Sequence, residues 1–440
     1  VDGRSIYLSS LGGVRWDTLP LNIADIDRIE VVRGPNAASY GANALTGIIN
    51  IITRHPAEVE GRMFSATVGA NKRQDYLFRW AGGDSQKHRV SIGWHQDQGF
   101  PALYDSGHGP TVNYYGDFDL SDGQTMSVQI GYLGGVRDAG DAFNPVSREH
   151  DERIDSSFQQ IDYRKSLGEG RELLVKAYHN HLLGKETVPV VYPGIVPGTT
   201  YARDLESERW HGESQLNLTL SQTARITLGG YGRRDLVNSE HYFHTADDLV
   251  TWSWGAFTHA EWRLHPNWLF NAGVMWETHD LGGTAASPRV ALSWQPDPRH
   301  SARIGVSRAT RNPVQAEANA DWRFDLPLVG GGTTTITRLA SNSAIQPESN
   351  LSREIAYVGN WPQYGLGFDM RVYRDRLQNL IDVQSGTRYM SNVADSTHKG
   401  LDAQLRWKPA AHTFVVLNYA QLHIRSEEHT SELQSHSFIS

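Results

Sequence analysis

Two histidines at close spacing are the first residues of this 440-residue chain that could do chemistry. His179 and His181 are separated by one residue in the segment YHNHLL. On a strand their imidazoles would share one face, as a pair of metal ligands does. The sequence identifies no third ligand. The spacing is explained better by two polar side chains on one face of a strand, directed either into the lumen of a β-barrel or toward a membrane boundary. We therefore predict no metal site and no metal or organic cofactor.

A second histidine pair, His241 and His244, lies with two aromatic residues in the segment HYFH. Two interpretations of this pair are equally compatible with the sequence: contact with a ligand, or exposure to solvent in a loop.

Acidic residues gather in one connecting segment and could offer the oxygen ligands that calcium prefers. These residues are Asp138, Asp141, Asp151 and Asp155. Their spacing matches no calcium-binding loop, so we interpret them as solvated charges. No serine, histidine and aspartate set is accompanied by a nucleophile-elbow sequence. We predict that the protein is not an enzyme.

Residues 28–56 read RIEVVRGPNAASYGANALTGIINIITRHP, and a glycine-rich segment of this kind could cradle a phosphate. The segment lacks GxGxxG spacing and a Gly-Lys-Ser/Thr sequence. Gly47 is followed by the strand-forming sequence IINIIT, where a phosphate loop needs a helix. We predict instead a β-loop-β unit in which glycine allows close backbone approach.

Composition excludes several classes of protein. The chain has no cysteine, so disulfide scaffolds and thiolate metal sites are ruled out. Its formal net charge is −8, whereas a nucleic-acid-binding protein normally presents a basic face. No apolar run approaches the ~18 residues that a membrane helix requires. A membrane β-barrel is still possible, because each of its strands shows only alternation over about ten residues.

That alternation recurs along the chain. In TMSVQIGYL, residues 125–133, apolar side chains on one face alternate with Thr125, Ser127, Gln129 and Gly131 on the other. QLNLTL at 215–220, SARIGVS at 301–307 and LDAQLRW at 401–407 repeat the pattern. A period of two is typical of strands. We count about seventeen candidate strands after residue 61 by this signal and by the turn residues between them.

The connections between these strands alternate between short and long. Short ones such as 167–171 and 295–299 carry the residues of tight turns, whereas 183–206 and 310–351 are long. This alternation places tight turns at one end of the strands and long loops at the other, as in an outer-membrane barrel with periplasmic turns and extracellular loops. The polar faces would then line the lumen.

In this context the glycine-rich segment resembles the plug domain of TonB-dependent outer-membrane receptors. The matching residues are Asp25, Ile26, Arg28 to Val32, Arg33, Gly34, Pro35, Ala37, Tyr40, Gly41, Ala44, Gly47 and Ile48 to Thr53. Thr46 departs from the pattern, because a second glycine is common there. The resemblance implies a mostly all-β protein, a transmembrane antiparallel β-barrel with an N-terminal plug domain in its lumen.

The resemblance also implies contacts between plug and barrel. Glu30 and Arg33 would pair with opposite charges on the inner wall, and Gly34, Tyr40 and Gly41 would lie in the loop that approaches it. Weak pairs in a wet lumen can be rearranged when the plug moves.

Both the plug and the barrel are expected to be incomplete in this chain. We assign residues 1–60 to the C-terminal half of the plug and 61–424 to a partial barrel. A plugged receptor barrel has about twenty-two strands, so about five would be missing. Residues 425–440, with RSEEHTSELQSH, look like the translation of a sequencing adapter, and we treat them as foreign.

Ligand contacts are expected on two surfaces. By resemblance, the plug apex would contribute Tyr7, Arg15 and Trp16, since an aromatic ring beside a cation suits an anionic or planar chelate. The extracellular loops would contribute Tyr104, His108, Tyr192, Tyr201, His241, Tyr242, His244, Trp322 and Tyr389. For the tyrosines and tryptophans, a place in the aromatic girdle of the membrane boundary is an equal alternative.

The resemblance implies energised uptake of a scarce substrate across the bacterial outer membrane. The expected partners are TonB, acting through an N-terminal box outside this chain, outer-membrane lipid, and an iron-siderophore chelate as the substrate. Cobalamin or a carbohydrate is the alternative substrate, and a passive porin is the alternative class. No nucleic acid is expected.

Overall fold

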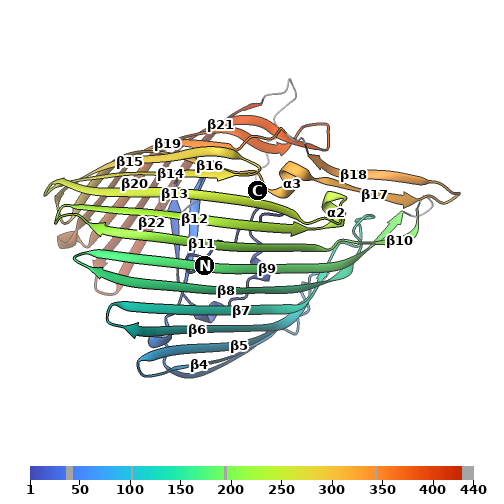
Figure 1. Cartoon of the computed structure of the whole chain (residues 1–440), viewed down its shortest axis with the longest axis horizontal. Coiled ribbons are helices and arrows are strands. Elements are labelled where there is room, and N and C mark those ends of the chain that lie inside the picture. Colours follow the sequence, from blue (N-terminus) through green and yellow to red (C-terminus); the bar gives the residue numbers. More distant parts are fainter. Residues whose placement is uncertain (36–42, 101–102, 193–195, 342–343, 429–440) are drawn as a thin grey trace.

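Two short strands lie inside a cylinder of mostly longer ones (Figure 1). The structure is a computed structural model that describes residues 1–35, 43–100, 103–192, 196–341 and 344–428. The inner part contains η1 (Trp16–Thr18), η2 (Ile23–Asp25), β1 (Ile26–Arg33), β2 (Gly47–Thr53) and η3 (Pro56–Glu58). No helix within these described ranges has the length and hydropathy needed to cross a membrane.

The β-branched runs of the glycine-rich segment form the antiparallel pair β1–β2, in which Glu30 lies opposite Asn50. Two glycines show why the segment needs residues without a side chain. A Cβ atom on Gly47 would lie 2.9 Å from the carbonyl oxygen of Val32, and Gly34 has a φ of +88°. The predicted β-loop-β unit is confirmed at both strands, whereas residues 36–42 lie outside the described part.

The surrounding wall consists of long strands with a few short helices at their ends. Its elements are β3 (Gly61–Val68), β4 (Gln74–Gly82), β5 (Gln86–Asp97), β6 (Gly107–Ser121), β7 (Gln124–Ala139), β8 (His150–Gly168), β9 (Arg171–Tyr192), β10 (Val196–Ala202), β11 (Leu205–Thr219), β12 (Ala224–Asn238), α2 (Glu240–Phe243), β13 (Leu249–His265), β14 (Trp268–His279), β15 (Gly283–Asp297), β16 (His300–Arg311), α3 (Gln315–Asn319), β17 (Asp321–Pro327), β18 (Thr333–Ser341), β19 (Glu348–Trp361), η4 (Pro362–Tyr364), β20 (Leu366–Val383), β21 (Tyr389–Ala410) and β22 (Thr413–Glu428).

The twenty wall strands found in the described residues belong to one barrel sheet. Seventeen of them follow one another as antiparallel neighbours from β3 to β22, with β9 pairing to β11 and β16 pairing to β19. This agrees with the number expected from the alternation. Where β22 and β3 adjoin in the barrel order, the described residues include no paired register, and both strands are exposed along almost their whole length.

Three strands were not expected from the sequence. β10 pairs with the end of β9, and β17 and β18 form a hairpin within the long connection 310–351. A small apolar core of Val146, Val190 and Leu326 joins this hairpin to neighbouring loops. These elements lie with α2 and α3 at one end of the barrel, on the right of Figure 1, so the long connections have folded into a structured rim.

Polar side chains line the lumen and apolar ones face outward, as the alternation predicts. On β7 the side chain of Gln129 is buried, whereas Ile130 is 44% exposed on the opposite face. On β8, Gln160 is buried and Ile161 is exposed. Because the lumen holds the plug, a polar residue that faces inward finds hydrogen-bond partners and an apolar residue that faces outward meets hydrocarbon.

At the far end of the chain, residues Arg425 to Glu428 extend β22 and pair with β21. Residues 429–440 lie outside the described part of the chain. The assignment of 425–440 to a foreign sequence stays a prediction.

Candidate ligand-binding site between the plug apex and the extracellular rim

The plug loop before η1 is held against the inner wall by arginines of the barrel. Arg209 donates hydrogen bonds to the carbonyl oxygen of Tyr7 at 2.9 Å and to the hydroxyl of Ser5 at 3.1 Å. The guanidinium of Arg209 is itself paired with Asp235 at 2.6 Å. On the other side, Arg311 approaches the Tyr7 hydroxyl at 3.5 Å. The predicted apical tyrosine is therefore fixed between two wall strands, β11 and β16.

Arg15 attaches the tip of this loop to strand β8. Its guanidinium binds both carboxylate oxygens of Glu152, at 2.7 and 2.8 Å. Burial disfavours the charge of Arg15, but the hydrogen bonds and negative charge of Glu152 outweigh burial, so the pKa of Arg15 is raised. Asp17, two residues further on, pairs with Arg137 of β7. The loop tip is thus connected to the wall by charge pairs that a ligand or a movement of the plug could exchange.

A second ion pair lies next to the first on the same wall. Glu186 of β9 is directly opposite Glu152 in the strand register. Arg203 binds both oxygens of Glu186, at 2.6 and 2.9 Å, and His150 contacts the same carboxylate at 2.7 Å. Two neighbouring carboxylates facing the lumen are tolerated because each has a bidentate guanidinium partner.

Aromatic side chains from three rim segments stack above these ion pairs. Tyr201 of β10 lies parallel to His241 of α2, with ring centroids 4.7 Å apart, and also stacks on Phe324 of β17 at 5.0 Å. Trp322 meets the edge of Tyr242 at 5.0 Å and of His241 at 5.5 Å. We call these five residues the rim aromatic cluster. Such offset and edge-on contacts are the preferred geometries of aromatic rings.

The rim aromatic cluster is electrically neutral near pH 7. Burial lowers the pKa of His241 to about 4, and the positive charge of Arg203 adds to the effect. Burial likewise raises the pKa of Tyr242 to about 12. The Nε2 atom of His241 and the Nε1 atom of Trp322 are both buried without a hydrogen-bond partner. The cluster therefore offers ring faces together with two unused polar atoms.

The lowered pKa of His241 makes the packing of α2 dependent on pH. A histidine in an opened loop binds a proton near pH 6.5, so the packed state should be fully stable above this value and lose stability as the pH falls toward 4. Arg203 and Glu186 are the charged groups that act on the imidazole. We expect the hydrogen-exchange protection factors of residues 239–244, which correct for the intrinsic pH dependence of exchange, to fall over this range.

Two variants separate this effect from general acid lability. His241→Phe keeps an aromatic ring that cannot be protonated, so the protection factors should become nearly independent of pH. His244→Asn replaces the exposed C-cap histidine of α2, whose φ of +52° asparagine tolerates, and should behave like the unmodified protein. An unchanged pH dependence in His241→Phe would contradict the assignment.

The structure brings together only some of the residues expected to contact a ligand. Arg15, Tyr201, His241, Tyr242 and Trp322 meet at the cluster and the ion pairs beneath it. Trp16 is exposed on η1, and His244 is exposed at the end of α2. Tyr389 is exposed at the start of β21.

Three other residues that were expected to contact a ligand belong to strands and loops outside the cluster. His108 lies near the start of strand β6 and not in a loop, with its ring 6.1 Å from Trp94, an exposed residue of the outward face. The hydroxyl of Tyr104 donates to Asp151, at the outer end of β8. Tyr192 ends β9, and its side chain lies outside the described residues.

Sequence reasoning missed Glu152, Glu186, Arg203 and Phe324. A usable signal was present for the first, because Glu152 shares the lumen-facing parity of Gln160 along β8. The others could be recognised only once the rim had folded.

The plug–barrel contacts agree only in part with expectation. Arg33 pairs with Asp402 of β21 at 2.8 Å, and Gly34 lies against Arg371. Glu30, however, accepts hydrogen bonds from Arg28 and Asn50 within the plug. Its predicted pairing with the wall is wrong, because the adjacent arginine on β1 is nearer. Tyr40 and Gly41 lie outside the described residues.

The candidate metal ligands also have specific locations. His179 stacks on Trp210 with centroids 4.0 Å apart, at the outer surface of the barrel. His181 lies near Glu206 and Glu208 of the next strand, with ligand atoms within 4.8 Å of one another. Its Nε2 already contacts Glu206 at 2.9 Å, and we assign no metal to the group.

Two of the acidic residues of the loop segment are neighbours, because Asp138 lies directly opposite Asp151 in the register of β7 and β8. Asp138 accepts a hydrogen bond from Ser106, Asp151 accepts one from Tyr104, and Asp155 accepts one from Tyr132.

Together, these features define a plugged β-barrel receptor of the bacterial outer membrane. Comparison with known families gives the same result: the model "TonB dependent receptor-like, beta-barrel" matches residues 61–433, and the "TonB-dependent Receptor Plug Domain" matches residues 1–48. The chain belongs to the TonB-dependent receptor family.

Similar curated proteins include two transport receptors. The vitamin B12 transporter BtuB of Vibrio cholerae is 25% identical over 438 residues, which cover 91% of this chain and 62% of BtuB. The ferric enterobactin receptor of Pseudomonas aeruginosa is 22% identical over 457 residues, covering 87% of this chain and 60% of that receptor. The chain therefore spans about three fifths of the length of these relatives.

Solved structures show the same fold. The siderophore receptor PirA from Pseudomonas aeruginosa superposes with a TM-score of 0.74 at 16% identity, covering 95% of this chain and 76% of PirA. The FrpB iron transporter from Neisseria meningitidis gives a TM-score of 0.73 at 11% identity, covering 93% and 70% of the two chains.

Proposed function

We propose that this chain is the greater part of a receptor that binds a scarce substrate outside the cell and imports it with energy supplied through TonB. The observation that supports this best is the rim aromatic cluster, which lies over the plug loop. Tyr242 is close enough to Arg15 and Arg203 to influence both charges. A ligand bound to the rings would thus touch the rim and the plug at once.

The substrate that we favour is an iron-siderophore chelate. Planar aromatic groups of a chelate could stack on Tyr201, Tyr242 and Trp322, and its negative charge could compete with Glu152 for Arg15. Loss of the Arg15–Glu152 pair would then report occupancy to the plug. Cobalamin is the second candidate, supported by the 25% identity to BtuB. A carbohydrate has no comparable support among the contacts described.

Release into the periplasm would require movement of the plug. The pairs Arg15–Glu152, Asp17–Arg137 and Arg33–Asp402 join the plug to three different wall strands. The more exposed pairs Asp17–Arg137 and Arg33–Asp402 each contribute at most about 1 kcal/mol, and the bidentate Arg15–Glu152 pair contributes more. A pull from TonB could exchange them one after another.

The complete receptor, expressed in cells with and without TonB, tests this proposal. We expect a radiolabelled ferric catecholate siderophore to bind in both strains and to accumulate only in the strain with TonB. Cyanocobalamin serves as the parallel substrate. Accumulation of either compound independent of TonB would point to a passive channel and contradict the proposal.

A further inference from the structure

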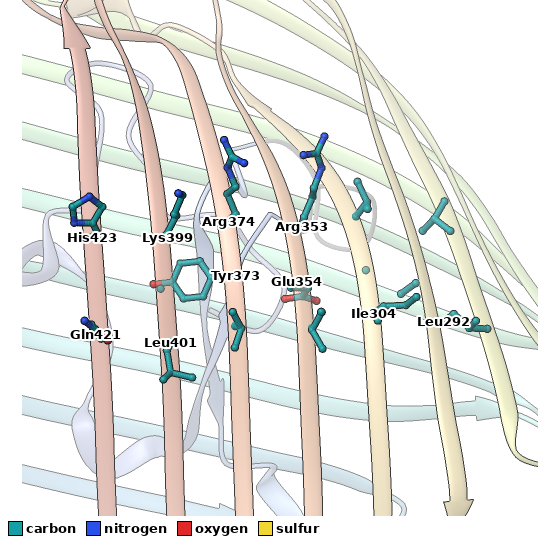
Figure 2. A pocket seen from close by; sticks show the side chains of 17 residues that line it. Leu292, Ile304, Arg353, Glu354, Tyr373, Arg374, Lys399, Leu401, Gln421 and His423 are labelled. Carbon is teal, nitrogen blue, oxygen red and sulfur yellow. The ribbon is translucent and has the colours of Figure 1, made fainter.

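Four basic side chains form a row across the outward face of four neighbouring strands. Arg353 of β19 lies opposite Arg374 of β20, Arg374 lies opposite Lys399 of β21, and Lys399 lies opposite His423 of β22. Figure 2 shows them side by side. We call these residues the basic row.

The basic row faces away from the plug. The next residues along two of the strands, Glu354 and Tyr373, belong to the lumen face, where Glu354 binds Arg303 and Arg371. Beyond them, Ile355 and Val372 return to the outward face and are 59% and 44% exposed. Strand alternation therefore assigns the row to the surface that meets lipid.

None of the four basic side chains has an ion pair or a side-chain hydrogen bond among the described residues. Arg308 and Arg376, which are also exposed on outward positions nearby, add further positive charge. Like charges directly opposite each other on adjacent strands destabilise a sheet. An external anion at this position would remove that repulsion.

An apolar groove of about 750 Å³ adjoins the row on its periplasmic side. Its outward-facing lining includes Val306 at the level of the row and, below it, Leu292, Ile304, Ile355, Val372 and Leu401. In Figure 2, Leu401 and Ile304 lie below the basic row. Strand β22, which carries His423, runs upward in this view, toward the extracellular end. Further down, Trp361 ends β19. The side chains on this surface therefore change from positively charged to apolar in the direction from the cell exterior to the membrane interior.

We propose that this surface binds a phosphorylated lipid of the leaflet that faces the outside. Phosphate groups would bind Arg353, Arg374 and Lys399, with His423 beside them, while acyl chains would fill the groove beneath. A soluble phosphate would not account for the apolar groove, and an uncharged lipid would not account for the basic row. Because the basic row lies directly above the apolar groove, one amphipathic molecule can occupy both.

The proposal can be tested on the complete receptor purified in mild detergent. Native mass spectrometry would count retained molecules of a bisphosphorylated, multiply acylated glucosamine lipid. We expect Arg353→Gln/Arg374→Gln/Lys399→Gln to weaken retention on the order of 100-fold, because each basic residue near a charged membrane surface contributes several-fold. Arg153→Gln removes an exposed outward arginine of β8 that is paired with Asp155, and retention should be unchanged.

A second measurement holds even if the triple variant fails to assemble. The unmodified receptor should retain the bisphosphorylated lipid and lose most binding when both phosphates are removed enzymatically. Equal retention of the dephosphorylated lipid, or full displacement by millimolar inorganic phosphate, would overturn the proposal. So would normal lipid retention by a correctly assembled triple variant.

Discussion

Replacing Tyr242 and Trp322 together by alanine should weaken binding of a ferric catecholate siderophore to the complete receptor by at least ~30-fold. Buried aromatic anchors at binding surfaces commonly contribute 2 kcal/mol or more, which corresponds to about this change in Kd. Both rings belong to the rim aromatic cluster, where their centroids are 5.0 Å apart. Titration of the purified receptor, followed by fluorescence quenching or calorimetry, would measure the loss.

The matched control is Tyr389→Ala, which removes an exposed tyrosine of the same rim outside the cluster. Its affinity should be unchanged, and both variants should keep the heat-modifiable mobility of an assembled barrel. Tyr242→Phe should retain most of the affinity, because the ring is preserved. Equal affinities for the double variant and the control would show that the substrate binds elsewhere.

Replacing Asp235 by alanine should reduce the free energy of unfolding by about 3–5 kcal/mol, the usual result of removing one partner of a buried ion pair. Asp235 is 2% exposed and lies between Arg209, at 2.6 Å, and Arg233, at 3.3 Å. Without it, two buried guanidiniums would face each other with no counter-ion. Arg209 would also hold Tyr7 and Ser5 of the plug less firmly.

Thermal unfolding of the complete receptor in detergent, followed by tryptophan fluorescence, would measure this change. Asp247→Ala, an exposed aspartate in the connection between β12 and β13, should unfold like the unmodified protein. If Asp235→Ala were as stable as this control, water would have to solvate the arginines, and the triad could not be the anchor of the plug loop.

Much of the fold could be predicted because barrel strands obey local rules. A lumen-facing residue such as Gln129 and a lipid-facing one such as Ile130 alternate along the chain, and tight turns separate the strands. The plug strands β1 and β2 could be predicted equally well, since their β-branched runs and Gly47 determine a short antiparallel pair. The hairpin β17–β18 escaped detection because its apolar core is built with Val146 and Val190, residues more than a hundred positions away.

The candidate site was less predictable. Arg15, Tyr201 and Trp322 were selected for their residue types, yet the same reasoning selected His108, which lies beside Trp94 and apart from the rim aromatic cluster. Glu30 was expected to reach the wall but is bound by Arg28 two residues away. Residue type reports what a side chain can do, whereas its partner depends on which segments fold against it.

By itself, the sequence determined that this protein is a plugged outer-membrane barrel, because period-two alternation and the glycine-rich plug segment depend only on neighbouring residues. Tertiary structure alone decided that Arg15 binds Glu152, that five aromatic residues from three rim segments form one cluster, and that Arg353, Arg374, Lys399 and His423 lie in one row. Those contacts join segments far apart in the sequence, and the basic row also depends on strand register, which is set by pairing across the whole sheet. A shift by one residue within β19 to β22 would turn its side chains to the lumen face.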